Sequence, residues 1–169
     1  MKIVLIGFMG SGKSKVGEAL ARKLGWDFID TDKLVVEKGG ASIPEIFRTR
    51  GEAAFRDLER QVVTEVAKKN RLVIATGGGI PLNPKNMDDL SRDGLVIWLQ
   101  VSPEKVLQRA GDISTRPLID PQDPIGSIAK RLKDRIPFYS QAPICINTDT
   151  LTVSQVADKI LANVQGLKK

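Results

Sequence analysis

The sequence predicts an α/β protein with a three-layer α/β/α fold around a central five-stranded parallel sheet. Five short runs rich in Val, Ile and Leu lack apolar–polar alternation, which is typical of strands covered on both faces. Amphipathic helical patterns separate these runs, and strands that alternate with helices form parallel sheets. A glycine-rich loop joins the first strand to the first helix. At 169 residues the chain is expected to form a single domain, residues 1–169.

The strands are expected where the apolar runs stand between helix signals. They are Lys2–Ile6, Asp27–Asp30, Leu72–Thr76, Leu95–Leu99 and Ile144–Asn147.

The helices are expected from fourfold apolar spacing and from capping signals. They are Lys13–Leu24 ending at Gly25, Glu52–Lys69, a helix opening at Ser102-Pro103-Glu104, a helix beginning near Ile125, and a helix after the capping box Thr152–Gln155.

Two segments interrupt this regular alternation. Residues 31–60 insert helical material between the second and third strands. Residues 111–125 contain three prolines and no apolar period. Segments of that length without regular structure are often lids over active sites, so we expect 111–125 to be a lid.

Composition limits the chemistry. The chain has no histidine, which excludes histidine bases and histidine metal ligands, and its one cysteine, Cys145, excludes an internal disulfide. We expect Cys145 to be a buried core residue. The net charge of +6 favours an anionic partner. The apolar N-terminus resembles a secretion signal, but charges from Lys13 onward interrupt it and no run could span a membrane, so a cytoplasmic location is expected.

The strongest motif is Gly7-Phe8-Met9-Gly10-Ser11-Gly12-Lys13-Ser14, a complete G-x-x-x-x-G-K-[ST] phosphate loop. Its glycines let backbone N–H groups surround a phosphate, and the helix that follows adds a positive dipole. Lys13 would reach the β- and γ-phosphates, and the Ser14 hydroxyl would bind Mg²⁺. The alternative is a glycine turn with a surface lysine. A switch GTPase is disfavoured because the sequence has no N-K-x-D element, and a small-molecule kinase is favoured.

A second group of residues could hold the acceptor of the phosphoryl group. Asp30 and Asp32 end the second strand, where one could hold a metal's water shell and the other could accept a hydrogen bond from the attacking hydroxyl. Capping of a helix is the alternative. The run Thr76–Ile80 has three glycines after the third strand, which permit close approach to a substrate or simply a tight turn.

Three arginines complete the pattern: Arg56 in the insertion, Arg116 in the expected lid and Arg135 in a later helix. A lid arginine can stabilise a transferring phosphoryl group, and a guanidinium grips a carboxylate bidentately. Each of the three could equally be a solvated surface residue.

Together these motifs resemble the shikimate kinases along almost the whole chain. The matching pieces are Gly7–Ser14 with Val16-Gly17, Asp30-Thr31-Asp32, Gly51-Glu52 with Phe55-Arg56 and Glu59, Gly77–Gly79, Thr115-Arg116-Pro117-Leu118, and Arg135-Ile136-Pro137-Phe138-Tyr139. The resemblance implies a P-loop kinase fold and ATP- and Mg²⁺-dependent phosphorylation of the 3-hydroxyl of shikimate, a step towards chorismate and the aromatic amino acids.

The resemblance also implies a role for each matching residue. Asp32 would contact the accepting hydroxyl as base or positioner, and Asp30 would reach Mg²⁺ through water. Arg56, Arg135 and the backbone of Gly78 and Gly79 would hold shikimate, with Ile43, Phe47 and Phe55 packed around it or simply in the core. The nucleotide would be bound by Gly10, Ser11, Gly12, Lys13, Ser14, Lys15, Arg109 (near the adenine) and Arg116 (from the lid).

One residue departs from the family pattern. Lys15 stands where the family commonly has threonine, and its alternative role is a solvated helix residue. Other functions compatible with the sequence are a kinase for another small molecule such as gluconate, a nucleic-acid-binding module and an inactive P-loop scaffold. We expect a monomer that acts on ATP and shikimate, with no nucleic-acid or membrane partner.

Overall fold

A computed structural model, which describes residues 1–110 and 120–166, confirms the α/β fold with a five-stranded parallel sheet. The strand order is β2-β3-β1-β4-β5, and every neighbouring pair is parallel. The strands are β1 (Lys2–Ile6), β2 (Asp27–Asp30), β3 (Leu72–Ala75), β4 (Gly94–Gln100) and β5 (Ile144–Asn147). Their bounds lie within one residue of those expected from the sequence.

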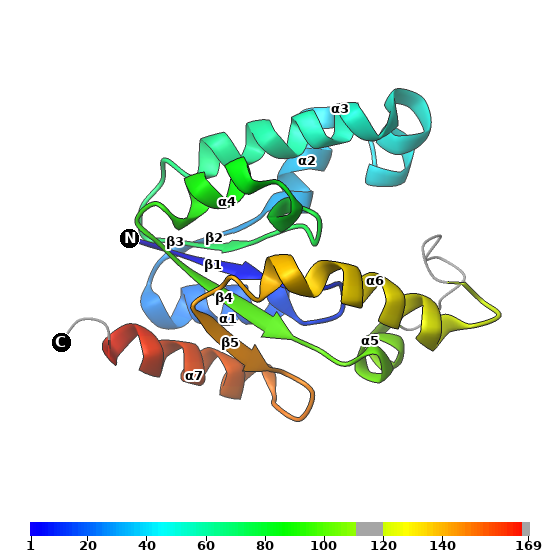
Figure 1. The fold of residues 1–169 in the computed structure, drawn as a ribbon. Coiled ribbons are helices and arrows are strands. Elements are labelled where there is room, and N and C mark those ends of the chain that lie inside the picture. The colour runs from blue at the N-terminus through cyan, green and yellow to red at the C-terminus, as the bar shows by residue number, and fades with distance from the viewer. Residues whose placement is uncertain (111–119, 167–169) are drawn as a thin grey trace.

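Helices cover both faces of the sheet (Figure 1). They are α1 (Lys13–Leu24), α2 (Thr31–Gly39), α3 (Ile43–Val66), α4 (Pro84–Ser91), α5 (Pro103–Ala110), α6 (Pro124–Tyr139) and α7 (Val153–Gly166), with a short 3-10 helix η1 at Ile80–Leu82. The capping box before α7 is present, since the Thr152 hydroxyl accepts from Gln155 N and the Gln155 side chain accepts from Thr152 N. No helix in the described ranges is both long enough and apolar enough to cross a bilayer.

The core has two parts, one on each face of the sheet. Ile3 and Leu5 of β1 pack with α1 and α7, whereas Val4 and Ile6 pack on the other face with α2 to α6. Successive side chains of a strand point to opposite faces, so β1 is completely buried. All carboxyl ends of the strands lie at one edge of the sheet (Figure 1).

The insertion forms α2 and α3. Helix α3 begins at Ile43, before the expected Glu52, and it is interrupted at Gly51, whose φ of 80° and ψ of 173° are not helical. Its first segment buries Ile46 alone, which explains why the apolar period there is weak in the sequence. Phe55, four residues after the interruption, is buried.

Two expectations about burial are wrong. Cys145 is exposed, because β5 is an edge strand whose Ile144 and Ile146 face the core beside α7 while Cys145 points to the other face. Strand β2 lies at the opposite edge and is likewise only partly covered.

Most of the expected lid, residues 111–119 with Arg116, lies outside the described residues, and its last two residues, Pro124 and Ile125, begin α6.

Candidate active site

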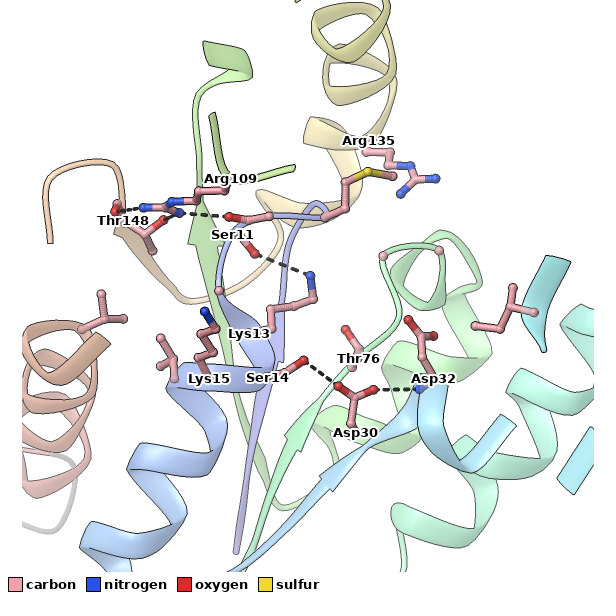
Figure 2. Close-up of a pocket in the computed structure, with 18 of the residues that line it drawn as sticks. Ser11, Lys13, Ser14, Lys15, Asp30, Asp32, Thr76, Arg109, Arg135 and Thr148 are labelled. Carbon is pink, nitrogen blue, oxygen red and sulfur yellow. Dashed lines mark hydrogen bonds between the residues drawn. The ribbon is translucent and has the colours of Figure 1, made fainter. Parts of the chain in front are cut away.

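A cavity of about 860 Å³ lies at the carboxyl edge of the sheet (Figure 2). Its walls come from the segments that follow β1, β2 and β3, and from α3, α6 and the start of α7. Parallel strands place these segments side by side although they are far apart in the sequence, which is the usual position of ligand sites in open α/β sheets.

The phosphate loop has the backbone conformation that its glycines allow. Gly7, Gly10 and Gly12 all have positive φ, and Gly12 in the left-handed region is the N-cap of α1. Lys13 folds back over the loop, where its Nζ donates to Gly7 O at 2.8 Å and Phe8 O at 2.9 Å. The loop therefore presents a helix N-terminus and an ammonium group to an anion.

The surroundings of Lys13 favour its neutral form more than water does. Burial lowers the pKa of Lys13 from 10.5 to about 8, although the carboxylates of Asp32 and Asp30 act in the opposite direction. A bound polyphosphate adds negative charge next to the ammonium and would raise this pKa again. Binding of such an anion is therefore coupled to the protonation of Lys13.

Asp30 joins the phosphate loop to the acceptor side. Its carboxylate accepts from the Ser14 hydroxyl at 2.5 Å and, as the N-cap of α2, from Asp32 N at 3.0 Å. Asp30 therefore caps a helix, as the alternative interpretation expected, and its carboxylate contacts the Ser14 hydroxyl at the same time. A hydroxyl and a carboxylate supply two oxygen ligands beside the loop, and Mg²⁺ usually takes one or two protein oxygens and completes its shell with water and phosphate. These residues fit such an ion.

Asp32 has the environment of a base. Burial, together with the negative charge of Asp30, raises the pKa of Asp32, and Lys13 opposes this effect. Because α2 begins at Thr31, the Asp32 side chain extends from the first turn of the helix toward the cavity (Figure 2). A carboxylate with a raised pKa accepts a proton more readily than an ordinary aspartate.

Each glycine of the turn after β3 is pressed against one residue of the acceptor side. A methyl group at Gly77 would clash with the Asp32 carboxylate, and one at Gly79 would clash with the Arg56 guanidinium. A methyl group at Gly78 would lie 2.9 Å from Nη1 of Arg135. The segment is a tight turn, and its glycines allow these side chains to approach the backbone closely. Close approach to a substrate stays a prediction.

Arg56 is held by two carboxylates of its own helix. Its Nη1 donates to Glu59 at 2.6 Å, and its Nη2 and Nε donate to the exposed Glu52. Glu59 is almost completely buried, and this burial raises its pKa against the opposing effect of Arg56. Glu59 belongs to the matching sequence piece around Phe55-Arg56, but no role was expected for it. Its spacing of three from Arg56 is the signal that predicts an ion pair on one helix face.

Two further arginines, Arg109 and Arg135, border the cavity (Figure 2). Arg135 lies on α6 with its guanidinium 5.3 Å from the centre of the Phe8 ring. Arg109 on α5 donates to Gly10 O at 2.9 Å and to Thr148 O at 2.7 Å. Sequence reasoning missed Thr148, because no local pattern indicates that its loop meets α5.

Lys15 lines the cavity in the first turn of α1 and is exposed (Figure 2). Leu151 and Val153, ahead of and within α7, also line the cavity. Among the described residues no carboxylate forms an ion pair with Lys15. Its charge is therefore available to an anion in the cavity.

The structure thus brings together the residues expected to bind the nucleotide and those expected to bind the acceptor. The set consists of Gly10, Ser11, Gly12, Lys13, Ser14, Lys15, Asp30, Asp32, Arg56, Gly78, Gly79, Arg109 and Arg135. Arg116 lies outside the described residues.

Comparison with known proteins gives a consistent result. The shikimate kinase family model matches residues 9–165. The shikimate kinase of Thermodesulfovibrio yellowstonii is 42% identical over 165 residues, which cover 98% of this chain and 95% of that protein. The shikimate kinase of Moorella thermoacetica is 48% identical over 158 residues, covering 94% and 91% of the two chains.

Solved structures agree. Shikimate kinase from Acinetobacter baumannii in complex with shikimate matches with a TM-score of 0.92 and 38% identity over 99% of this chain and 94% of that one. A gluconokinase from Sinorhizobium meliloti matches with a TM-score of 0.63 and 19% identity, over 98% and 92% of the chains. The second likeness shows a shared fold alone.

The lowered pKa of Lys13 leads to a prediction about nucleotide affinity. Well below pH 8 Lys13 of the free protein already carries its ammonium charge, so the affinity for ATP should not change with pH through this group. Above pH 8 binding must take up a proton, so the dissociation constant should rise toward about tenfold per pH unit. Calorimetric titration with ATP between pH 7.5 and 9.5 measures this slope.

The control is Lys13→Arg, since arginine stays protonated throughout that range. The variant should bind ATP with a dissociation constant that does not change between pH 7.5 and 9.5. A flat profile for the unmodified protein, or an equal slope in both proteins, would contradict the coupling.

Proposed function

The chain belongs to the shikimate kinase family and is an enzyme that transfers phosphate from ATP to shikimate, and we propose which of its residues perform this reaction. One observation carries the proposal: a single cavity joins the phosphate loop to a set of aspartates, arginines and glycine amides suited to a hydroxylated carboxylic acid. The reaction at the 3-hydroxyl of shikimate belongs to the pathway of aromatic amino acid biosynthesis.

The loop from Gly10 to Ser14 would bind the β- and γ-phosphates of ATP. Its N–H groups and Lys13 would neutralise the charge that spreads over the transferring phosphoryl group. Arg109, fixed by Gly10 and Thr148, would lie beside the adenine end of the nucleotide. Arg116 is proposed as a further cation on the phosphates from the family resemblance alone.

Mg²⁺ would be held by the Ser14 hydroxyl and, through water, by Asp30. The hydrogen bond between these two side chains supports this assignment, because both are oxygen ligands at one point of the cavity. Within the described residues no group of three or more acidic or cysteine side chains is placed to hold a metal ion. The ion would supply positive charge to the β- and γ-phosphate oxygens.

The acceptor would lie between the insertion, the glycine turn and α6. Arg56 and Arg135 would hold its carboxylate, and the N–H groups of Gly78 and Gly79 would donate to its oxygens. Asp32 would accept a hydrogen bond from the attacking hydroxyl, which orients it and removes its proton as the new bond forms. Glu59 would hold the Arg56 guanidinium in position by accepting its hydrogen bond. Catalysis then rests on position and charge, with no covalent intermediate.

The monomer expected from the sequence stays part of the proposal. The balance of cations and carboxylates around the cavity also assigns part of the net charge to small anionic substrates. The proposal therefore includes no nucleic-acid or membrane partner.

The direct test is ADP release in a coupled assay with ATP and shikimate. We expect turnover with shikimate, at least a hundredfold less with gluconate at equal concentration, and loss of turnover when EDTA removes Mg²⁺. Restored turnover on adding Mg²⁺ is the control for EDTA. Equal rates with both acids would contradict the acceptor assignment, and full activity in EDTA would contradict the metal assignment.

Asp32→Asn should lower kcat by about two to four orders of magnitude, because the amide can no longer take the proton of the attacking hydroxyl. The dissociation constant for ATP, measured by calorimetry, should change little. Asp57→Asn is the matched control, since Asp57 is an exposed residue of α3 outside the cavity lining. Normal turnover in the Asp32 variant would overturn its role.

Lys15→Thr restores the residue that the family commonly has. It should raise the KM for ATP about three- to tenfold through loss of one partly solvated charge, with the KM for shikimate unchanged. The effect should shrink at high salt. Lys69→Thr, at an exposed lysine far from the cavity lining, is the control. An unchanged KM for ATP at low salt would assign Lys15 to the solvated surface.

A further inference from the structure

Tyr139 at the end of α6 makes an unusual contact for a core residue. Its side chain is fully buried, and its hydroxyl donates a hydrogen bond of 2.8 Å to the backbone oxygen of Gly78, 61 residues away. Its ring packs against Trp98 of β4 with centroids 6.1 Å apart. The tyrosine thus connects α6 and the centre of the sheet to the glycine turn.

The Gly78 carbonyl belongs to the same peptide group as the Gly79 N–H. A trans peptide is planar, and its C=O and N–H point in opposite directions, so a bond that fixes the oxygen also fixes the direction of the N–H. Glycine on both sides allows such a peptide to rotate at little steric cost, so an anchor is needed to select one orientation. Within the described residues no protein group accepts a hydrogen bond from the Gly79 N–H, and Gly79 lines the cavity.

A second anchor holds the other end of the turn. Gly77 N donates to the buried Thr31 hydroxyl at 2.8 Å, next to Asp32 in sequence. Tyr139 plays the corresponding part on the side of Arg135, which precedes it by one helical turn on α6. The glycine turn is therefore fixed at both ends to the elements that carry the acceptor-side residues.

We propose that Tyr139 is a positioning residue for the acceptor: by binding the Gly78 carbonyl it aims the Gly79 N–H at an oxygen of the bound hydroxy acid. This inference rests on the proposed function. It assigns to Tyr139 no contact with the substrate and no part in proton transfer. Its effect should fall mainly on the acceptor half of the cavity, because the glycines of the turn lie closest to Asp32, Arg135 and Arg56.

Tyr139→Phe tests the proposal, since it removes the hydroxyl and keeps the buried ring. We expect the KM and the dissociation constant for shikimate to rise about tenfold, because the Gly79 N–H is no longer held toward the substrate and one hydrogen bond to it is weakened. The KM for ATP should stay within about twofold. In amide NMR spectra, shikimate should shift the Gly79 signal of the unmodified protein and should shift it far less in the variant.

Trp98→Phe is the matched control, because it loosens the packing of the same tyrosine ring and leaves the hydroxyl in place. It should lower the thermal unfolding temperature without a selective change in the KM for shikimate. The inference is overturned if Tyr139→Phe leaves that KM unchanged, or if it raises both KM values together as a general loss of stability would.

The unmodified protein separates this inference from the proposed function. Absence of any turnover with shikimate would overturn both. Turnover together with a Gly79 amide that does not respond to shikimate would overturn the role of Tyr139 and the contact of the Gly79 N–H with the acceptor, and it would leave the kinase reaction in place. That measurement needs no variant.

Discussion

The pairing of β1 between β3 and β4 is the constraint on which the site depends. Because β1 is buried on both faces, its backbone is fixed by parallel ladders on each side and its carboxyl end cannot move relative to theirs. The phosphate loop starts where β1 ends, and the glycine turn starts where β3 ends. The buried centre of the sheet therefore positions the phosphate loop and the glycine turn, against which α2, α3 and α6 place their side chains.

Charge balance is the second constraint. Three carboxylates, those of Asp30, Asp32 and Glu59, lie among the cations of the cavity, and each contacts or faces a partner of the opposite sign or a backbone N–H. Without substrates, these contacts stabilise an otherwise costly group of buried charges. Burial still lowers the pKa of Lys13 and raises that of Asp32, so both pKa values lie closer to neutral pH than they would in water. Such groups respond strongly to a bound anion.

Sequence reasoning succeeded where the signal is local. The phosphate loop, the cap before α7 and the strand ranges depend on residues within one element, so spacing alone predicts them. It failed for Cys145, because whether a strand lies at the edge of a sheet depends on the order of all five strands. It also assigned no role to Glu59 or Tyr139, whose partners are a side chain one turn away and a carbonyl 61 residues away.

The sequence by itself determined which chemical groups this protein can use: a phosphate loop, a pair of aspartates, arginines able to bind an anion, and no histidine. These are properties of residue types at fixed spacing, which the chain carries in any conformation. Only the tertiary structure decided that Asp32, Arg135 and Arg56 each press against a different glycine of one turn. That arrangement arises from the packing of α2, α3 and α6 around the end of β3, and close packing between distant segments leaves no periodic signal in a sequence.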